Sequence, residues 1–404
     1  SGGIGAVKWE TTPQTGSFQA AAGRGYFMNT TSGALTLTLP SGSAGAIVAV
    51  SDYARTFQTN NLTISPQSGE KIGGVAEDLT LNVNGQALTL VYVDSTKGWI
   101  NVQNAEDTVT ASNFIDATGG TITSCGNDKI HTFTGPGTFA VTRVHPCAAN
   151  NQVSYMVVGG GGGSGSANGG YGTGGGGAGG FREDKSPVTP YTASPLEGAG
   201  PITVTATSYP ITIGAGGAAG TEPTPNLGSA GGTSTFSTIT SAGGGQTQGN
   251  GGSGGGGGPG HSTGVGSGGT GNTPPVTPSQ GSNGGPGGHT AGGVGAGGGG
   301  GATAVGGTAT TGPSAVAGPG GAGATTEING SSTAFAGGGG GATNKGAPAI
   351  GPGGAGGGGT GSNPTCDGSN GTANTGGGAG GANGNPVPGK TGGSGIVIIR
   401  YKAQ

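Results

Sequence analysis

The 404-residue sequence has little charge. Only 7% of its residues are Asp, Glu, Lys or Arg, the formal net charge is −3, and the basic residues are not clustered. Nucleic-acid binding depends on a concentrated basic surface, so we expect no nucleic-acid partner. No apolar run approaches the ~20 residues that cross a bilayer, so membrane insertion is not expected either.

Aromatic residues and sulfur are also scarce, with two Trp, two Met and three Cys. Much of the 30% hydrophobic content is Ala, and the side chains that build an ordinary core are concentrated in residues 1–155. The odd number of cysteines leaves at least one of Cys125, Cys147 and Cys366 unpaired. Cys125 and Cys147 could bridge two adjacent strands, or they could be two unrelated thiols.

The sequence offers no arrangement typical of catalysis. The four histidines are not at ligand spacing to one another, to a cysteine or to a carboxylate, apart from His145 two residues before Cys147. No Ser/His/Asp set or carboxylate pair can be argued. We therefore expect a protein that is not an enzyme and that uses neither a metal nor a cofactor.

One stretch, Gly384–Thr391, matches the phosphate-binding pattern G-x-x-x-x-G-K-[ST]. That loop works between a strand and a helix, whereas glycine-rich sequence lies on both sides here. Two prolines inside the loop also remove amide donors. The match is expected by chance in a chain with 107 glycines.

Glycine is the abundant residue, at 107 of 404 against an average usage of about 7%. Glycine-rich sequence is usually a flexible linker. Here it extends over more than half of the chain and ends in the apolar stretch 396–401, which needs a partner strand. Polyproline-II helices have outward-facing amides and three residues per turn, and glycine lets them pack closely. The sequence predicts packed polyglycine helices of this kind.

Short β-strands are expected in the rest of the chain. Leu35, Leu37 and Leu39 alternate with threonines, which is typical of a half-buried strand. Asn84-Gly85 lies between two apolar runs, 79–83 and 88–93, and predicts a hairpin. A second hairpin is expected around residues 135–137, between 129–133 and 138–141. Residues 153–158 form a further predicted strand.

The predicted fold class is therefore all-β N-terminal units, then a glycine-rich domain of packed polyglycine (polyproline-II-type) helices with short β-strands, and essentially no α-helix. The predicted divisions are a β-sandwich or β-hairpin domain over 1–105, a β connector over 106–158, and a glycine-rich domain over 159–404 closed by strand 396–401.

Several stretches resemble the glycine-rich domain of phage tail-fibre proteins. They are the strand 153–158 before a glycine block, Gly179-Gly-Phe-Arg-Glu, Ser208-Tyr-Pro-Ile-Thr-Ile-Gly-Ala-Gly-Gly and the ending Gly392-Gly-Ser-Gly-Ile-Val-Ile-Ile-Arg-Tyr-Lys. The N-terminal part, with Trp9-Glu-Thr-Thr-Pro, is similar to β-domains of fibre-like proteins in marine tailed phages. The tail-tip adhesins of T-even-like phages offer an architectural parallel.

The resemblance implies an extracellular virion protein, the distal adhesin of a tail fibre. Its partners would be a host cell-surface glycan or outer-membrane protein and other fibre or virion proteins. Phage fibres are usually homotrimers, although a monomeric tip is compatible with the sequence. The alternative is a purely structural protein: a head fibre, a decoration protein or a self-assembling extracellular filament.

Binding would be carried by the loops that interrupt a rigid scaffold. Three polar stretches, 181–210, 261–289 and 363–376, combine amides with occasional aromatics. The candidate receptor-binding residues in them are Phe181, Arg182, Tyr191, His261, Asn272, Gln280, His289, Asn363 and Asp367. For Tyr209, Phe236 and Phe335 a place in a small core is the preferred interpretation.

Overall fold

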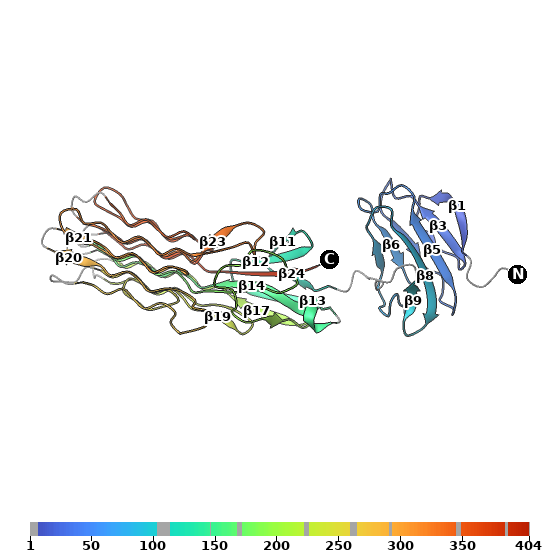
Figure 1. Ribbon diagram of the computed structural model, residues 1–404, viewed down its shortest axis with the longest axis horizontal. Coiled ribbons are helices and arrows are strands. Elements are labelled where there is room, and N and C mark those ends of the chain that lie inside the picture. The colour runs from blue at the N-terminus through green and yellow to red at the C-terminus, as the bar shows by residue number, and fades with distance from the viewer. Residues whose placement is uncertain are drawn as a thin grey trace. The chain divides into compact units, whose positions relative to one another are not determined.

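The chain consists of two compact units, Ser1–Phe114 and Ile115–Gln404. The computed structural model describes residues 7–102, 114–145, 147–167, 172–221, 226–258, 265–290, 293–344, 349–383 and 387–403 (Figure 1). Described residues contain β-strands and one short 3-10 helix, Ala148–Asn151, but no α-helix. The expectation of an all-β chain is confirmed.

The first unit is formed by two sheets around one core. One sheet has the order β1 (Lys8–Gln14), β3 (Arg24–Met28), β5 (Ile47–Asp52), β8 (Ala87–Asp94) and β9 (Gly98–Asn101); the other has β2 (Phe18–Gln19), β4 (Leu35–Thr38), β6 (Leu62–Ser65) and β7 (Leu79–Leu81). From β1 to β6 the chain alternates between the sheets, so neighbours within each sheet are parallel. Leu37 and Leu39 are fully buried in the shared core, as their alternation predicts.

The hairpin expected at Asn84-Gly85 is wrong. β7 pairs with β6 in one sheet, whereas β8 pairs with β5 and β9 in the other. The turn therefore crosses between sheets, and the Gly85 N–H donates to Asp52 Oδ2 at the end of β5 (2.9 Å). A turn that joins strands of two packed sheets shows the same alternation of apolar residues as a hairpin, because in both cases the two strands bury their leucines in one core.

The second unit contains two larger sheets and two small hairpins. The five-stranded sheet has the order β10 (Asp116–Thr118), β13 (Gly137–Arg143), β17 (Ser208–Thr212), β18 (Ser234–Phe236), β19 (Ile239–Ser241). The six-stranded sheet has β11 (Thr121–Cys125), β12 (Asp128–Phe133), β24 (Ile396–Lys402), β14 (Gln152–Val158) and β15 (Phe181–Asp184), with β16 (Ile202–Thr203) beside β14. β20 (Gly288–Thr290) pairs with β21 (Gly293–Gly295), and β22 (Ala324–Thr326) with β23 (Thr333–Phe335).

Residues 115–158 are part of this second unit and not a separate connector, because β10 to β14 belong to its sheets. The hairpin expected around residues 135–137 is also wrong: β12 pairs with β11 and β24, and β13 with β10 and β17. The strands themselves lie where the sequence predicts them.

The last strand, β24, lies at the centre of the six-stranded sheet, between β12 and β14. Val397, Ile399 and Tyr401 point into one core cluster, which also holds Tyr155 and Phe236. Ile396 and Ile398 point into another, on the opposite face, with Phe335. A strand that buries both faces reads as a continuous apolar run, which explains the sequence Ile396-Val-Ile-Ile.

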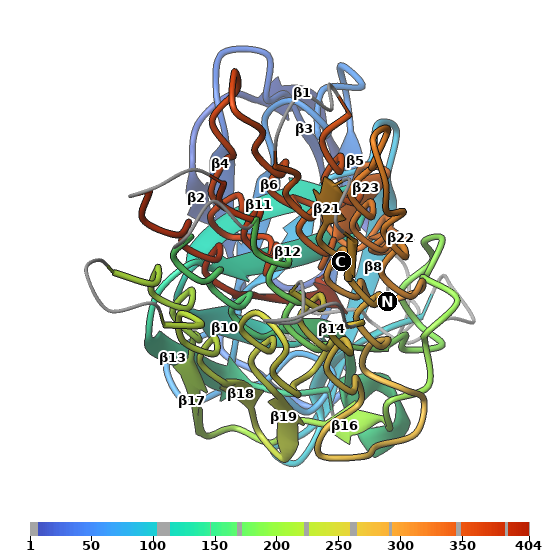
Figure 2. The same ribbon diagram turned by 90° about the vertical axis from the view of Figure 1, so that its left-hand side faces the viewer.

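The glycine-rich segments that connect the strands run side by side along the unit (Figure 1). They extend from the end that carries the two larger sheets, which we call the strand end, to the end that carries β20 and β21. In the end-on view each segment winds about its own axis (Figure 2). We call the second of these ends the loop end. It comprises β20, β21 and the described residues at 164–173, 226–228, 265–266, 310–316, 343–344, 362–367 and 387–390.

The hydrogen bonds of segment 159–164 repeat every three residues. Its amides donate in turn to three neighbours: Gly159 and Gly162 to Gly180 and Gly177, Gly160 and Gly163 to Gly232 and Ser229, and Gly161 and Ser164 to Gly393 and Lys390. Its carbonyls accept from three others: Gly160 and Gly163 from Gly244 and Thr247, Gly161 and Ser164 from Gly217 and Gly220, and Gly162 from Ala379. The segment is thus bonded to six neighbours, and its buried amides are satisfied without a sheet.

Side-chain size in these segments follows the direction that each residue faces. A Cβ added at Gly162 would overlap the carbonyl oxygen of Gly245, and one at Gly176 that of Gly162. Ala215 and Ala218, three residues apart on an outer segment, are exposed. Glycine is therefore required where backbones touch, whereas alanine occurs where the position faces solvent, as at Ala215, or an apolar cluster, as at Ala178.

Candidate binding surface at the loop end

The residues expected to bind a receptor lie at opposite ends of the second unit. Phe181, Arg182, Tyr191, Asn272 and Gln280 lie at the strand end, on or beside β15. His289, Asn363 and Asp367 lie at the loop end, because His289 is in β20 and the Thr343 N–H, beside β21, donates to the Ser362 carbonyl. His261 lies outside the described residues. The structure does not bring these residues together into one site.

Phe181 and Arg182 are buried parts of the scaffold. Phe181 has no exposed surface and belongs to the core cluster of Phe335 and Ile398. Arg182 Nη2 donates to the carbonyls of Ala199 (3.3 Å) and Thr277 (3.4 Å). Burial lowers the pKa of Arg182, an effect that Tyr155 partly opposes. Neither side chain is placed to touch a receptor.

Asn272 and Gln280 hold the loop 272–280 together. Gln280 is 1% exposed; its Nε2 donates to the Pro274 carbonyl (2.7 Å), and its Oε1 accepts from the Ala242 N–H (2.9 Å). Asn272 Oδ1 accepts from the N–H groups of Val276 (3.1 Å) and Gln280 (3.3 Å). The amides that suggested surface hydrogen bonding are used within the loop and to join it to Ala242.

Tyr191 joins a buried charged network that the sequence did not indicate. Its hydroxyl donates to Glu183 Oε1 (3.2 Å), and the Arg400 guanidinium lies 5.2 Å from its ring centroid. Burial and the neighbouring Glu183 raise the pKa of Tyr191. Glu183 is fully buried and also accepts from Ser194 N–H (2.9 Å) and Thr326 Oγ1. In a chain with so few charged residues, the presence of Glu183 is the one feature of the sequence that could have indicated this network.

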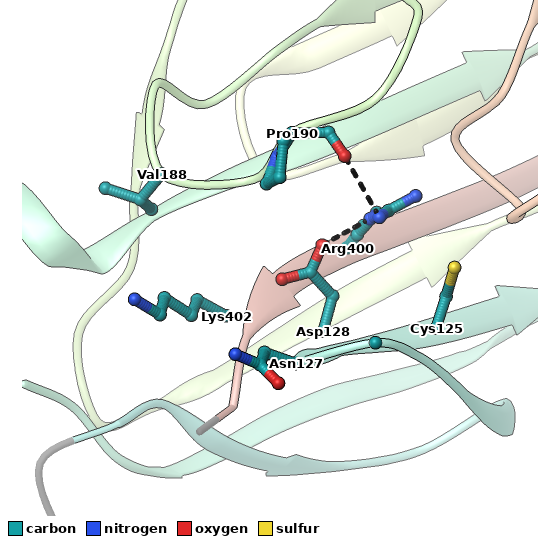
Figure 3. Close-up of a pocket in the computed structure, with 8 residues that line it drawn as sticks. Cys125, Asn127, Asp128, Val188, Pro190, Arg400 and Lys402 are labelled. Carbon is teal, nitrogen blue, oxygen red and sulfur yellow. Dashed lines mark hydrogen bonds and ion pairs between the residues drawn. The ribbon is translucent and has the colours of Figure 1, made fainter.

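Beside this network is an open depression of about 610 Å³, lined by Cys125, Gly126, Asn127, Asp128, Val188, Pro190, Arg400 and Lys402 (Figure 3). Two of its polar groups, the Arg400 guanidinium and the Asp128 carboxylate, already form hydrogen bonds within the protein. Arg400 Nε donates to Asp128 Oδ2 (2.7 Å), and its Nη atoms donate to the carbonyls of Glu327 (3.3 Å) and Pro190 (3.2 Å). The Arg400 and Asp128 side chains are therefore bonded within the protein and are not free to bind a ligand.

The bridge considered between Cys125 and Cys147 is not formed, and all three cysteines are free thiols. Cys125 ends β11 beside Gly330, whereas Cys147 precedes the 3-10 turn and is exposed. Within the described ranges no three His, Cys, Asp or Glu side chains are grouped to hold a metal ion. The described residues also include no helix with the length and apolarity to cross a membrane.

The loop end presents small and apolar side chains with few charges. Leu227 (46% exposed), Val265 (73%) and Val316 (41%) lie there. His289 is half-buried, Asn363 is 7% exposed and accepts from the Cys366 N–H (2.7 Å), and Asp367 is exposed. Among the described residues of the loop end, the charged residues are Asp367 and Lys390. The sequence did not indicate Leu227, Val265 and Val316, because isolated apolar residues between glycines look like core.

Comparison with known proteins assigns the glycine-rich part of the chain to a protein family. Residues 132–402 match a family described as a glycine-rich domain, and since they make up more than half of the chain, the chain belongs to that family. A segment of 94 residues is 33% identical to the baseplate wedge protein gp10 of Enterobacteria phage T4. This match covers 22% of the chain and 15% of the phage T4 protein, so the chain spans only a small part of that relative.

Proposed function

From its membership of the glycine-rich domain family and its partial similarity to a phage baseplate protein, we propose that the chain is a structural protein of a phage virion. Within the virion it acts as a distal tail-fibre adhesin, with the sheets of the second unit as the support of its loop end. The loop end contacts a host cell-surface glycan or outer-membrane protein. Catalysis has no part in this function.

The glycine segments are, in this proposal, polyglycine helices of the polyproline-II type. The three-residue repeat of hydrogen-bond partners around segment 159–164 supports this, since such helices have three residues per turn and no internal hydrogen bonds. Six bonded neighbours restrict the motion of a segment that has no side chains to pack. A rigid scaffold then holds the turns at its end in fixed positions, which is how loops commonly carry binding.

The observation that carries the adhesin role is the exposure of Leu227, Val265 and Val316 at one end of this scaffold. The Ser166 N–H donates to the carbonyl of Asn226, which precedes Leu227. The Gly287 N–H, beside β20, donates to the carbonyl of Gly266, which follows Val265. Exposed apolar groups on a nearly uncharged surface suit a partner that is itself weakly charged. His289 and Asp367 supply the polar contacts in the same region.

The test is binding of the labelled full chain to a panel of bacterial strains, together with competition against phage adsorption. Changing both Leu227 and Val265 to Glu should reduce binding at least about tenfold, because two charges would be placed in an apolar contact. Val93→Glu is the matched control, since Val93 is 50% exposed in the first unit. Absence of binding to every strain, or equal loss in the control, contradicts the proposal.

The alternative is a purely structural part of the virion, such as a baseplate component, head fibre or decoration protein. The similarity to a baseplate wedge protein favours it, because that relative is named for a structural position. A structural role predicts incorporation into particles with no effect of the purified chain on adsorption. Immuno-electron microscopy of particles, performed with the same competition assay, separates the two functions.

A further inference from the structure

β11 is an edge strand of the six-stranded sheet, paired only with β12 among the described strands. Its sequence, Thr121-Ile-Thr-Ser-Cys125, is uncharged and contains no proline. Its first four residues are exposed, and Ile122 is 45% exposed. Natural proteins usually protect such an edge with charges, prolines, bulges or a cover, because it can accept another strand.

The other edges of the two larger sheets, in the described part of the second unit, are protected. β15 is buried at all four residues, and the Glu183 carbonyl accepts the N–H groups of Gly198 (3.1 Å) and Ala199 (2.9 Å). β10 and β19 have three residues each, and Asp116 of β10 is 3.1 Å from Lys129 Nζ. β11 is longer than these and carries no such protection.

The register of β11 shows which backbone groups face outward. Cys125 and Asp128 flank a two-residue turn, Gly126-Asn127, in which Gly126 has a φ of 60°. The pair that closes such a turn is hydrogen-bonded, and hydrogen-bonded pairs alternate with non-bonded ones along an antiparallel ladder. Thr123 and Thr121 therefore bond to β12, whereas Ile122 and Ser124 direct their N–H and C=O groups away from the sheet.

We propose that β11 pairs with β11 of a second copy of this chain, antiparallel and centred on Ile122. In that arrangement the two Ile122 residues lie opposite each other and exchange both backbone hydrogen bonds. Thr121 lies opposite Thr123 of the second copy, because the sequence Thr-Ile-Thr is symmetric about its centre. Both the Ile–Ile and the Thr–Thr pairs are favourable across strands.

This symmetry, together with the absence of charge in β11, favours a second copy over any other occupant. A two-fold contact places each residue of the strand against the same strand, so any Lys or Glu in β11 would face a like charge nearby. β11 has none. The proposal does not depend on the adhesin role, and it replaces the trimer expected from the sequence with a two-fold pair.

Sedimentation velocity of the full chain over a range of concentrations tests the pairing. The wild-type chain should form a reversible dimer, and Ile122→Lys should weaken it at least about tenfold by opposing two charges at the centre. Ile122→Pro should weaken it as well, because it removes the outward N–H and leaves the bonds to β12 intact. Thr240→Lys, at an exposed position of β19, is the control and should not change the dimer.

Cross-linking gives a second measurement. Oxidised Ile122→Cys chain should form a disulfide-linked dimer, while the wild-type chain with its three native thiols and a Thr240→Cys control should not. Circular dichroism confirms that each variant is folded. A monomer at all concentrations, a trimer, or a dimer that Ile122→Lys leaves unchanged overturns the proposal.

Discussion

The Nε atom of Arg400 lies 2.7 Å from Oδ2 of Asp128, and this ion pair joins β24 to β12 across 272 residues of sequence. Both side chains are 5% exposed. The remaining guanidinium nitrogens reach the carbonyls of Glu327 and Pro190, so the pair also fixes two loops over the sheet. Its energetic role follows from burial: a charge left alone here could not be solvated by water.

Asp128→Asn should therefore lower the free energy of unfolding of the second unit by about 3 kcal/mol or more. The measurement is denaturant unfolding followed by tyrosine fluorescence. The control is Lys129→Met, which removes the exposed ion pair between Lys129 and Asp116 (38% and 42% exposed) and should cost less than about 1 kcal/mol. Equal losses in the two variants would contradict the importance of burial.

A second long-range contact gives a pH dependence. His131 Nδ1 lies 2.7 Å from the Gly119 carbonyl and therefore carries the proton, while Nε2 is 3.0 Å from the Tyr401 hydroxyl and accepts from it. Burial lowers the pKa of His131 below its ordinary value of 6.5, although the Gly119 carbonyl partly opposes this. The folded state thus favours neutral imidazole more strongly than the unfolded state does.

The direction in which stability changes with pH follows from that difference. The contribution of neutral His131 is fully present above pH 6.5, the ordinary value, and is lost as the pH falls below it towards the lowered folded-state pKa. Unfolding free energies measured from pH 8 down to pH 5 should decline below about pH 6.5. The same series with His131→Gln should lack this component; if its slope matches that of the wild type, another group is responsible.

The positions of strands were predictable because they depend on local alternation. Leu37 and Leu39 are buried and β24 closes the second unit, as their patterns indicate. Strand pairing was not predictable, because the apolar alternation around Asn84-Gly85 is the same whether the next strand continues one sheet or crosses to another. The winding of the first unit between two sheets is a long-range property with no local signal.

The candidate binding residues show the same limit. Arg182 and Gln280 were selected for their polar side chains, but their partners are carbonyls and amides contributed by Ala199, Thr277 and Ala242. A sequence shows which groups can form hydrogen bonds but not whether the fold already uses them. Asp367 and His289 lie at the loop end, away from the two larger sheets, and remain in the proposed surface.

The free cysteines lead to a chemical prediction. Alkylation of the unfolded, unreduced chain should add three groups per molecule, since Cys125, Cys147 and Cys366 are thiols. In the folded chain Cys147 and Cys366 should react faster than Cys125, because they are exposed and Cys125 is only half-exposed beside Gly330. Intact-mass spectrometry counts the groups, and addition of only one group to the unreduced chain would show that a disulfide exists.

The glycine segments give the last prediction, which tests whether close backbone packing accounts for their composition. Gly162→Ala places a methyl group onto the Gly245 carbonyl, between two backbones that cannot separate without breaking the Gly244–Gly160 and Thr247–Gly163 hydrogen bonds. The free energy of unfolding of the second unit should fall by at least about 2 kcal/mol. Gly135→Ala, where an added Cβ meets nothing within 4 Å, should change it by less than about 0.5 kcal/mol. Ala218→Gly, at an exposed position, should cost no more than the backbone entropy of one glycine, about 1 kcal/mol. If Gly162→Ala is as mild as Gly135→Ala, the segments are not held by contact between their backbones.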